Sequence, residues 1–290
     1  MLAVPSAASS DAAFSAAVSG ARAQMSASFA STSWNEERAL LDLLRDRDAE
    51  VRRQAVRSLK VWVSQRSSTR DAVLDLYQNS NEELSVRREA AKTLSVVTTY
   101  SDVHNALVDY AERGSDAGLR AISYKALYWE AAARSGVRDD ILDAARRETV
   151  PAIRHAAIWA LFATNDNRVK DALLDIARRD SDDAARVEAL KSSYGLMGYN
   201  DTRDAVYDLA RNPNTASAVR RAAILLHSNR VNSSQKDMLE DIARSDRDPA
   251  MRTAAIIALG NPRSDELMTY FHLVRRDRNG VMVGDPLDAE

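Results

Sequence analysis

Residues 46–59, DRDAEVRRQAVRSL, contain the pattern that decides the fold of this chain. An apolar residue, Val51, is followed directly by Arg52, then by the small residue Ala55 and by Leu59 one turn later. This spacing places Val51, Ala55 and Leu59 on one face of a helix, as in an amphipathic helix that packs on a neighbour. A charged residue directly after the first buried position needs a reason, because the same arginine recurs along the chain.

The pattern returns six more times in the 290-residue chain, at spacings of 32 to 35 residues. The third residue after each arginine is Ala or Ser, which lets neighbouring helices approach closely. A period near about 33 residues is typical of stacked helical pairs. We call the recurring residues the ladder arginines: Arg52, Arg87, Arg120, Arg154, Arg186, Arg220 and Arg252.

A second apolar segment precedes each ladder arginine, for example ALLDLLRD at 39–46 and KDALLDIARR at 170–179. A further segment, DELMTYFHLVRR at 265–276, follows the last arginine. Neither helix of a pair can bury its apolar face alone, so only stacking produces a continuous core. We therefore predict an all-α fold, a right-handed α-solenoid of about seven helix pairs plus a terminal helix.

Composition agrees with a helical chain and limits the chemistry. There are only 9 Gly and 6 Pro, and no Cys, which removes disulfides and thiolate sites. The 40 Lys and Arg against 42 Asp and Glu leave a net charge of −2, so no global charge draws the chain to nucleic acid. The chain has no run of 18 apolar residues, and we expect no membrane insertion.

Three segments are predicted. Residues 1–34 are rich in Ala and Ser and are expected to form a capping helix, a linker or a trimmed leader; Phe14, Val18 and Met25 fall at helical spacing. Residues 35–277 form the repeat array, and residues 278–290 a polar C-terminal tail. The compartment stays open: the cytoplasm is favoured, and export or membrane tethering through a missing N-terminal segment is the alternative.

Acidic residues before each second helix explain the ladder arginines. In the first repeat Asp48 stands four residues before Arg52, where it can cap the helix N-terminus. Asp46 stands six residues before Arg52. Residues in that position can reach an arginine of their own or the adjacent repeat, and the guanidinium fork can bridge two acceptors. We therefore interpret the ladder arginines as structural.

The units DAEVRRQAVRSL (48–59) and DPAMRTAAIIALG (248–260) resemble the HEAT repeats of the phycobilisome-lyase-like class, and the resemblance covers residues 36 to about 277. It implies a HEAT-like α-solenoid. That family includes scaffolds, transport adaptors and a few enzymes, so the resemblance does not choose an activity.

A partner surface is predicted on the second helices, which line the inner curve of such solenoids. Side chains one, five and nine positions after each ladder arginine should point into a concave groove. The groove would be basic in the first repeats, aromatic in the middle and apolar at the end. Each part also has an explanation without a partner: the lysines and arginines are ordinary solvated residues, the tryptophans pack on their neighbours, and the final helix or the tail covers the apolar end. Its predicted residues are Arg53, Arg57, Arg88, Lys92, Lys125, Trp129, His155, Trp159, Lys191, Leu225 and Ile257.

No catalytic centre is evident in the sequence. None of the four histidines is followed by Glu, and no HExxH, GxSxG, SxxK or phosphate-binding glycine loop occurs. His227 replaces a leucine of the repeat and is expected to be a satisfied, partly buried imidazole. We predict a non-catalytic protein-binding scaffold without metal or cofactor and leave the oligomeric state open. The alternative is a DNA glycosylase or bilin lyase of HEAT-like fold.

Overall fold

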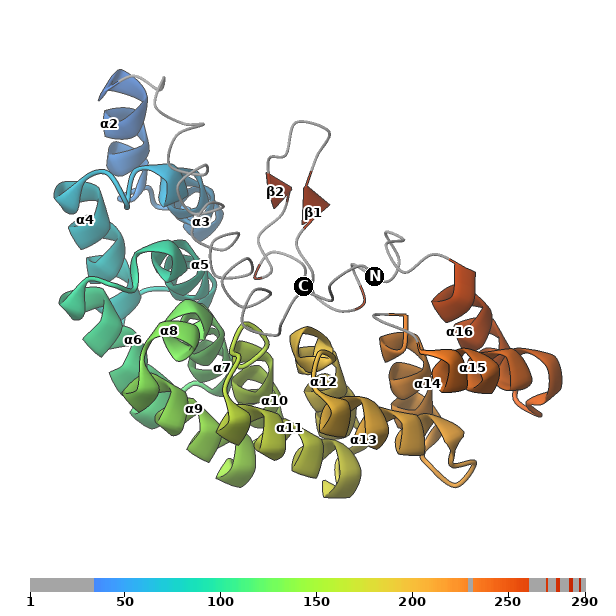
Figure 1. Ribbon diagram of the computed structural model, residues 1–290. Coiled ribbons are helices and arrows are strands. Elements are labelled where there is room, and N and C mark those ends of the chain that lie inside the picture. Colours follow the sequence, from blue (N-terminus) through green and yellow to red (C-terminus); the bar gives the residue numbers. More distant parts are fainter. Residues whose placement is uncertain are drawn as a thin grey trace, which may run out of the picture. The chain divides into compact units, whose positions relative to one another are not determined.

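The computed structural model describes residues 34–228, 232–260, 270, 275–276, 282–283 and 287. Helices dominate these residues, and they occur in pairs joined by short turns (Figure 1). The predicted capping helix in 1–34 lies outside the described residues. So does most of the expected final helix, although Tyr270 is helical.

The chain divides into two compact units, and each is described by itself. Unit 1 includes residues 1–133, and its described part contains three helix pairs followed by a short helix. The first helices of the pairs are α2 (Trp34–Leu43), α4 (Ser67–Gln78) and α6 (Ser101–Arg113); the second helices are α3 (Ala49–Ser58), α5 (Leu84–Leu94) and α7 (Ala117–Ala126), and α8 (Tyr128–Ala133) follows.

Unit 2 includes residues 134–275, and its described part contains four helix pairs. Its first helices are α9 (Ser135–Arg147), α11 (Asn167–Arg179), α13 (Asn200–Arg211) and α15 (Ser233–Ser245). Its second helices are α10 (Pro151–Ala160), α12 (Asp183–Ser192), α14 (Ser217–Leu226) and α16 (Pro249–Gly260). Short 3-10 turns, η1 (Leu59–Val61), η2 (Ser95–Val97) and η3 (Tyr194–Leu196), follow three second helices of the chain.

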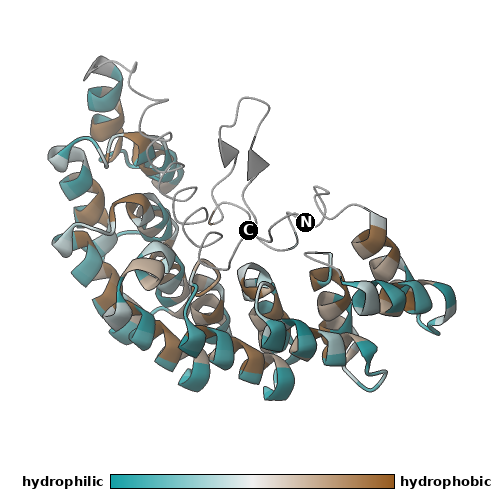
Figure 2. Cartoon of the chain, in the orientation of Figure 1, coloured by the Kyte–Doolittle hydropathy of each residue, from teal (hydrophilic) through white to brown (hydrophobic). Residues whose placement is uncertain are grey.

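Within each unit the second helices pack side by side in sequence order: α3 on α5 and α5 on α7 in unit 1, and α10, α12, α14 and α16 in unit 2. The small residue three positions after each ladder arginine makes this possible. Ala90 and Ala223, for example, are fully buried where adjacent helices meet. The first helices form the other layer of each unit, and many of the sides they turn away from the second helices are hydrophilic (Figure 2).

The core of each repeat follows the predicted spacing. In the second repeat Val86, Ala90 and Leu94 lie on one face and are fully buried. The last repeat departs from it, because Ile256, four positions after Arg252 and expected in the core, is 59 % exposed. No described helix pair follows α16, so one side of this helix has no neighbouring repeat in the part of the chain that the structure describes.

Aspartates begin several second helices, as the sequence predicts. The side chains of Asp48, Asp116, Asp182 and Asp248 accept hydrogen bonds from backbone N–H groups of the first turn, at 2.7 to 2.9 Å. These bonds satisfy N–H groups that have no partner inside the helix.

Two short strands qualify the all-α prediction. β1 (Arg275–Arg276) and β2 (Met282–Val283) pair in a two-stranded sheet, so the helix expected to run to Arg276 does not reach it. The segment predicted as a polar tail also contains a buried residue, Leu287. Among the described helices, none is both long and apolar enough to cross a membrane.

Candidate partner-binding surface

A row of cations lies on the second helices of unit 1, five positions after successive ladder arginines. We call Arg57 of α3, Lys92 of α5 and Lys125 of α7 the basic row. These helices pack side by side, so the three positions are equivalent points on consecutive repeats. Arg57 is exposed and Lys92 is half-buried. Neither side chain makes an ion pair or hydrogen bond with any residue in the described part of the chain.

Two cations one position after the ladder arginines, Arg53 and Arg88, form ion pairs within the chain. Arg53 forms a bidentate pair with Glu50 at 2.6 and 2.7 Å. Arg88 donates to Asp116 at 2.9 Å, across to the next second helix. These arginines therefore join or brace the repeats through ion pairs within the chain.

His155 is engaged in the same way in unit 2. Its Nε2 lies 2.7 Å from an oxygen of Asp182, the residue that caps the next second helix. Burial raises the pKa of Asp182, but the hydrogen bonds from His155 and from the Ala184 N–H outweigh it and leave this pKa below its usual value. His155 is thus a contact between repeats.

The aromatic and apolar parts of the predicted groove are covered. Trp159 is 3 % exposed and packs on Phe162, with ring centroids 4.9 Å apart. Leu225 is 2 % exposed and stands between two fully buried neighbours, so the end of α14 is buried on every side. Trp159 and Leu225 are therefore buried, whereas the spacing predicted that they point into an open groove.

The other predicted groove residues keep partial exposure. Trp129, in unit 1, is half-buried, and its ring lies 4.6 Å from that of Tyr128. Ile257 is half-buried at the last second helix. Lys191 of α12 is also half-buried, and its Nζ lies 4.8 Å from the ring centroid of Tyr270. The sequence did not single out Tyr270.

The ladder arginines bind backbone carbonyls at the ends of the first helices, a role that sequence reasoning missed. Arg87 donates to the Tyr77 carbonyl at 2.8 Å, and Arg186 to the Ala177 carbonyl at 3.0 Å. The last carbonyls of a helix have no hydrogen-bond donor inside that helix. An arginine near the start of the second helix supplies this donor to the end of the first helix. Arg120 and Arg220 make the equivalent bonds to Ala111 and Ala210. Arg52 and Arg252 instead donate through Nη1 to the carbonyls of Asp46 and Asp246, in the turns that follow the first helices.

Some ladder arginines also reach acids of the following repeat, as predicted. Arg154 contacts Asp180 at 3.2 Å and Asp182 at 3.3 Å. Arg220 pairs with Asp246, and both side chains are nearly buried. Arg52 instead pairs with Glu82, five residues before the next ladder arginine, at 2.6 Å. The arginines therefore fix both the turn within a repeat and its contact with the next one.

The remaining titratable side chains of interest are possible metal ligands and the buried His227. No group of three His, Asp or Glu side chains in the described residues is placed to hold a metal ion. His227 differs from its prediction: it is fully buried, and neither ring nitrogen has a hydrogen-bond partner. Burial lowers the pKa of His227 to about 4, an effect that the Val206 backbone opposes in part.

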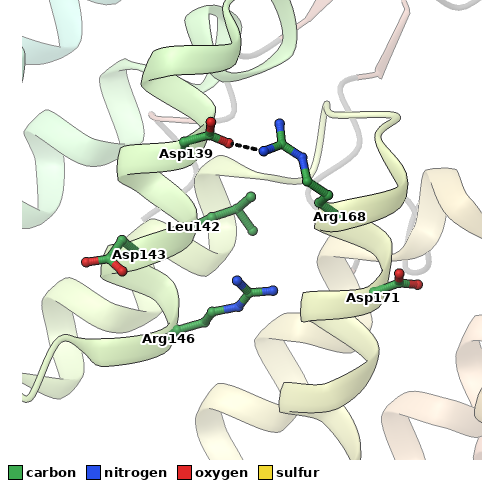
Figure 3. Close-up of a pocket in the computed structure, with 6 residues that line it drawn as sticks. All are labelled: Asp139, Leu142, Asp143, Arg146, Arg168 and Asp171. Carbon is green, nitrogen blue, oxygen red and sulfur yellow. Dashed lines mark ion pairs between the residues drawn. The ribbon is translucent and has the colours of Figure 1, made fainter.

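An open pocket of about 350 Å³ lies on the first helices of unit 2 (Figure 3). Asp139, Leu142, Asp143 and Arg146 of α9 line one side, and Arg168 and Asp171 of α11 the other. Arg168 pairs with Asp139 at 2.9 Å across it. Three aspartates and two arginines line it, and this pocket was not predicted.

Comparison with known proteins agrees with the repeat architecture. The family model of HEAT repeats matches residues 37–128, which include the ladder arginines Arg52, Arg87 and Arg120. Residues 37–128 are therefore HEAT repeats. The same pairing of helices continues through unit 2. None of the curated proteins matches this chain.

Solved structures similar to this chain include the complex of CpcE and CpcF of phycocyanin lyase from Nostoc sp. PCC7120, at 16 % identity over 81 % of this chain and 93 % of that one, with a TM-score of 0.47. Human deoxyhypusine hydroxylase has 16 % identity over 76 % and 82 %, with a TM-score of 0.38. An engineered protein has 19 % identity over 88 % and 71 %, with a TM-score of 0.42.

Proposed function

We propose that this protein is a non-catalytic scaffold whose basic row binds an acidic segment of a protein partner. The observation that carries the proposal is the contrast between two sets of cations in unit 1. Arg53 and Arg88 are held by carboxylates of the chain itself. Arg57 and Lys92, on the same two helices, have no such partner in the described structure.

The repeat supplies the geometry for such a partner. Equivalent positions on adjacent second helices recur once per repeat, so an extended segment running across α3, α5 and α7 meets one cation at each step. Charges of this kind mainly set orientation and the association rate, while buried anchors contribute most of the affinity. The partner is therefore expected to carry spaced Asp or Glu residues beside an apolar anchor.

Affinity capture from the source cell tests the proposal with two charge-reversal variants. Arg57→Glu plus Lys92→Glu removes the two unpaired cations of the row. Arg38→Glu plus Arg47→Glu is the matched control: both residues are exposed, lie in unit 1 and have no partner among the described residues. The basic-row variant should lose a captured protein that the wild type and the control retain.

Association with that protein should also slow as salt increases, because exposed charges are screened over about 8 Å at physiological ionic strength. In the basic-row variant this dependence should flatten. Equal capture by all three proteins would contradict the proposal. A steep, salt-dependent shift of duplex DNA that the basic-row variant abolishes would favour the nucleic-acid alternative instead.

A further inference from the structure

One residue from beyond the last repeat lies against the second helices of unit 2. The Tyr270 ring is 4.8 Å from Nζ of Lys191 on α12 and 5.6 Å from the guanidinium carbon of Arg221 on α14. Cations within about 6 Å of a ring centroid are attracted by the negative face of the ring. Because α12 and α14 pack side by side, the two cations flank one position.

The ring sits in a partly dry, charged environment. Tyr270 is half-buried, and burial raises the pKa of its phenol; Arg221 opposes this effect and Glu188 adds to it. Glu188 belongs to the same helix as Lys191. The phenol is therefore neutral at physiological pH, and its ring lies against two cations, with the Glu188 carboxylate acting on the phenol electrostatically.

The place of Tyr270 in the sequence makes this contact unusual. Packing in the array joins the two helices of a pair or neighbouring pairs, whereas Tyr270 follows the seventh pair and contacts the fifth and sixth. Lys191 is also five positions after its ladder arginine, the position that Arg57 and Lys92 occupy in unit 1. A side chain from outside the array thus occupies the repeat position that faces a partner in our proposal.

We infer that Lys191 and Arg221 form a slot for a tyrosine of a protein partner, and that Tyr270 fills this slot until the partner displaces it. The occupant is a tyrosine-bearing segment, because tyrosine is what the chain itself places there. The inference goes beyond the proposed function, whose basic row lies in unit 1, so either can fail without the other.

Tyr270 belongs to the same chain as the slot, so it competes with the tyrosine of any free segment. A tethered segment acts at an effective concentration on the order of millimolar, so a free segment of similar sequence cannot compete at micromolar concentration. Removing the ring of Tyr270 should open the slot without removing its cations.

The test uses the full chain and a labelled peptide with the sequence of residues 264–276, SDELMTYFHLVRR. Fluorescence anisotropy should show that the Tyr270→Ala protein binds this peptide at least about tenfold more tightly than the wild type. The peptide in which the tyrosine is replaced by alanine should lose this advantage. It keeps the neighbouring Phe271, so the comparison isolates the tyrosine.

Slot variants in the Tyr270→Ala background complete the test. Lys191→Ala plus Arg221→Ala should weaken peptide binding about tenfold or more. Lys236→Ala plus Arg244→Ala on α15 removes the same charge from exposed positions and should leave it unchanged. Circular dichroism establishes that each variant is folded. Equal peptide binding by wild type and Tyr270→Ala, no measurable binding by either, or equal losses in the slot and control variants would overturn the inference.

Discussion

His227 and Ser193 show how one position can be filled in different ways. Both stand where other repeats have leucine, and both are fully buried. Ser193 satisfies its hydroxyl by donating to the Ala189 carbonyl at 2.7 Å. The imidazole of His227 makes no hydrogen bond of normal geometry, although the Val206 backbone interacts with it, and its ring lies edge-on to Tyr207 at 6.3 Å. Since an unsatisfied buried polar group costs about 1–3 kcal/mol, His227 is a point of weakness in α14.

We expect His227→Leu to stabilise the protein and to reduce its sensitivity to acid. Burial lowers the pKa of His227 from its ordinary value of 6.5 to about 4 in the folded state, so the unfolded state binds more protons between these values. Stability is therefore lost as pH falls through this window, by about 2 kcal/mol between pH 6.5 and 4.5.

Urea unfolding at pH 7 and pH 4.5 measures this effect as the difference between wild type and variant. Carboxylates contribute equally to the acid-induced loss of stability in both proteins, so the difference isolates the contribution of His227. His104→Leu, at a half-buried position in α6, is the control and should keep the wild-type fall. The same fall in His227→Leu would mean that His227 does not titrate as described.

The turn between paired helices is the element that the ladder arginines stabilise. Arg220 is the most complete case: its Nε donates to the Ala210 carbonyl at 2.9 Å, and it pairs with Asp246 of the following repeat. It is 8 % exposed. One side chain therefore connects the end of α13, the start of α14 and the turn before α16.

Arg220→Ala should lower the free energy of unfolding by about 3 kcal/mol or more, because it leaves a nearly buried carboxylate and a helix-end carbonyl without their donor. The control Arg57→Ala, at an exposed position with no described partner, should stay within about 0.5 kcal/mol of wild type. Denaturant unfolding measures the stability of both variants. A similar loss of unfolding free energy in Arg220→Ala and Arg57→Ala would contradict the structural role of the ladder arginines.

Asp116 separates helix capping from pairing between repeats. Its side chain accepts from the Leu119 N–H at 2.7 Å and from Arg88 at 2.9 Å, and the Arg88 guanidinium lowers its pKa. Asp116→Asn keeps a capping oxygen and should cost less than about 1 kcal/mol, since the Arg88 pair is partly exposed.

Asp116→Ala removes both contacts and should cost about 1 kcal/mol more than Asp116→Asn. Protonation of Asp116 in acid removes the ion pair with Arg88 but leaves an oxygen that can cap the helix, so the capping cost of the alanine variant should persist after the ion pair is lost. Thermal unfolding of both variants at pH 7 and through the acid range measures this difference. Equal stability of Asn and Ala variants would exclude a capping role.

At the scale of the whole molecule, stability depends on how many neighbours a helix pair has. A repeat array gains stability at each contact between neighbouring repeats, so its end pairs have less support than its inner pairs. In unit 2, α14 packs between α12 and α16, and three consecutive residues at its end are buried. In α16, by contrast, Ile256 is 59 % exposed and Leu259 is half-buried.

Native-state hydrogen exchange should therefore show earlier exchange in α16 than in α14, through local opening that leaves the rest of unit 2 folded. Ile256→Ser, at the exposed position, should change the stability of unit 2 little, whereas Ile224→Ser, the equivalent buried residue of α14, should lower it by several kcal/mol, about 3 or more. Equal protection of α14 and α16 would indicate that the array opens as one cooperative unit.

The sequence by itself determined the repeat architecture, because a buried helix face, a small contact residue and a capping aspartate are local features that recur with one period. The spacing that places Val86, Ala90 and Leu94 on one face is confirmed by their burial. The same spacing indicated the side of the second helices on which Arg57, Lys92 and Lys191 lie.

Only the tertiary structure decided which of those side chains remain accessible. Arg88 and His155 are bound by acids 27 or 28 residues later, Trp159 packs on Phe162, and Lys191 meets Tyr270 from beyond the last repeat. The carbonyl partners of the ladder arginines are also set by the closure of each turn. Periodicity specifies the face of a helix, but accessibility depends on contacts between segments distant in sequence, and a local pattern carries no information about them.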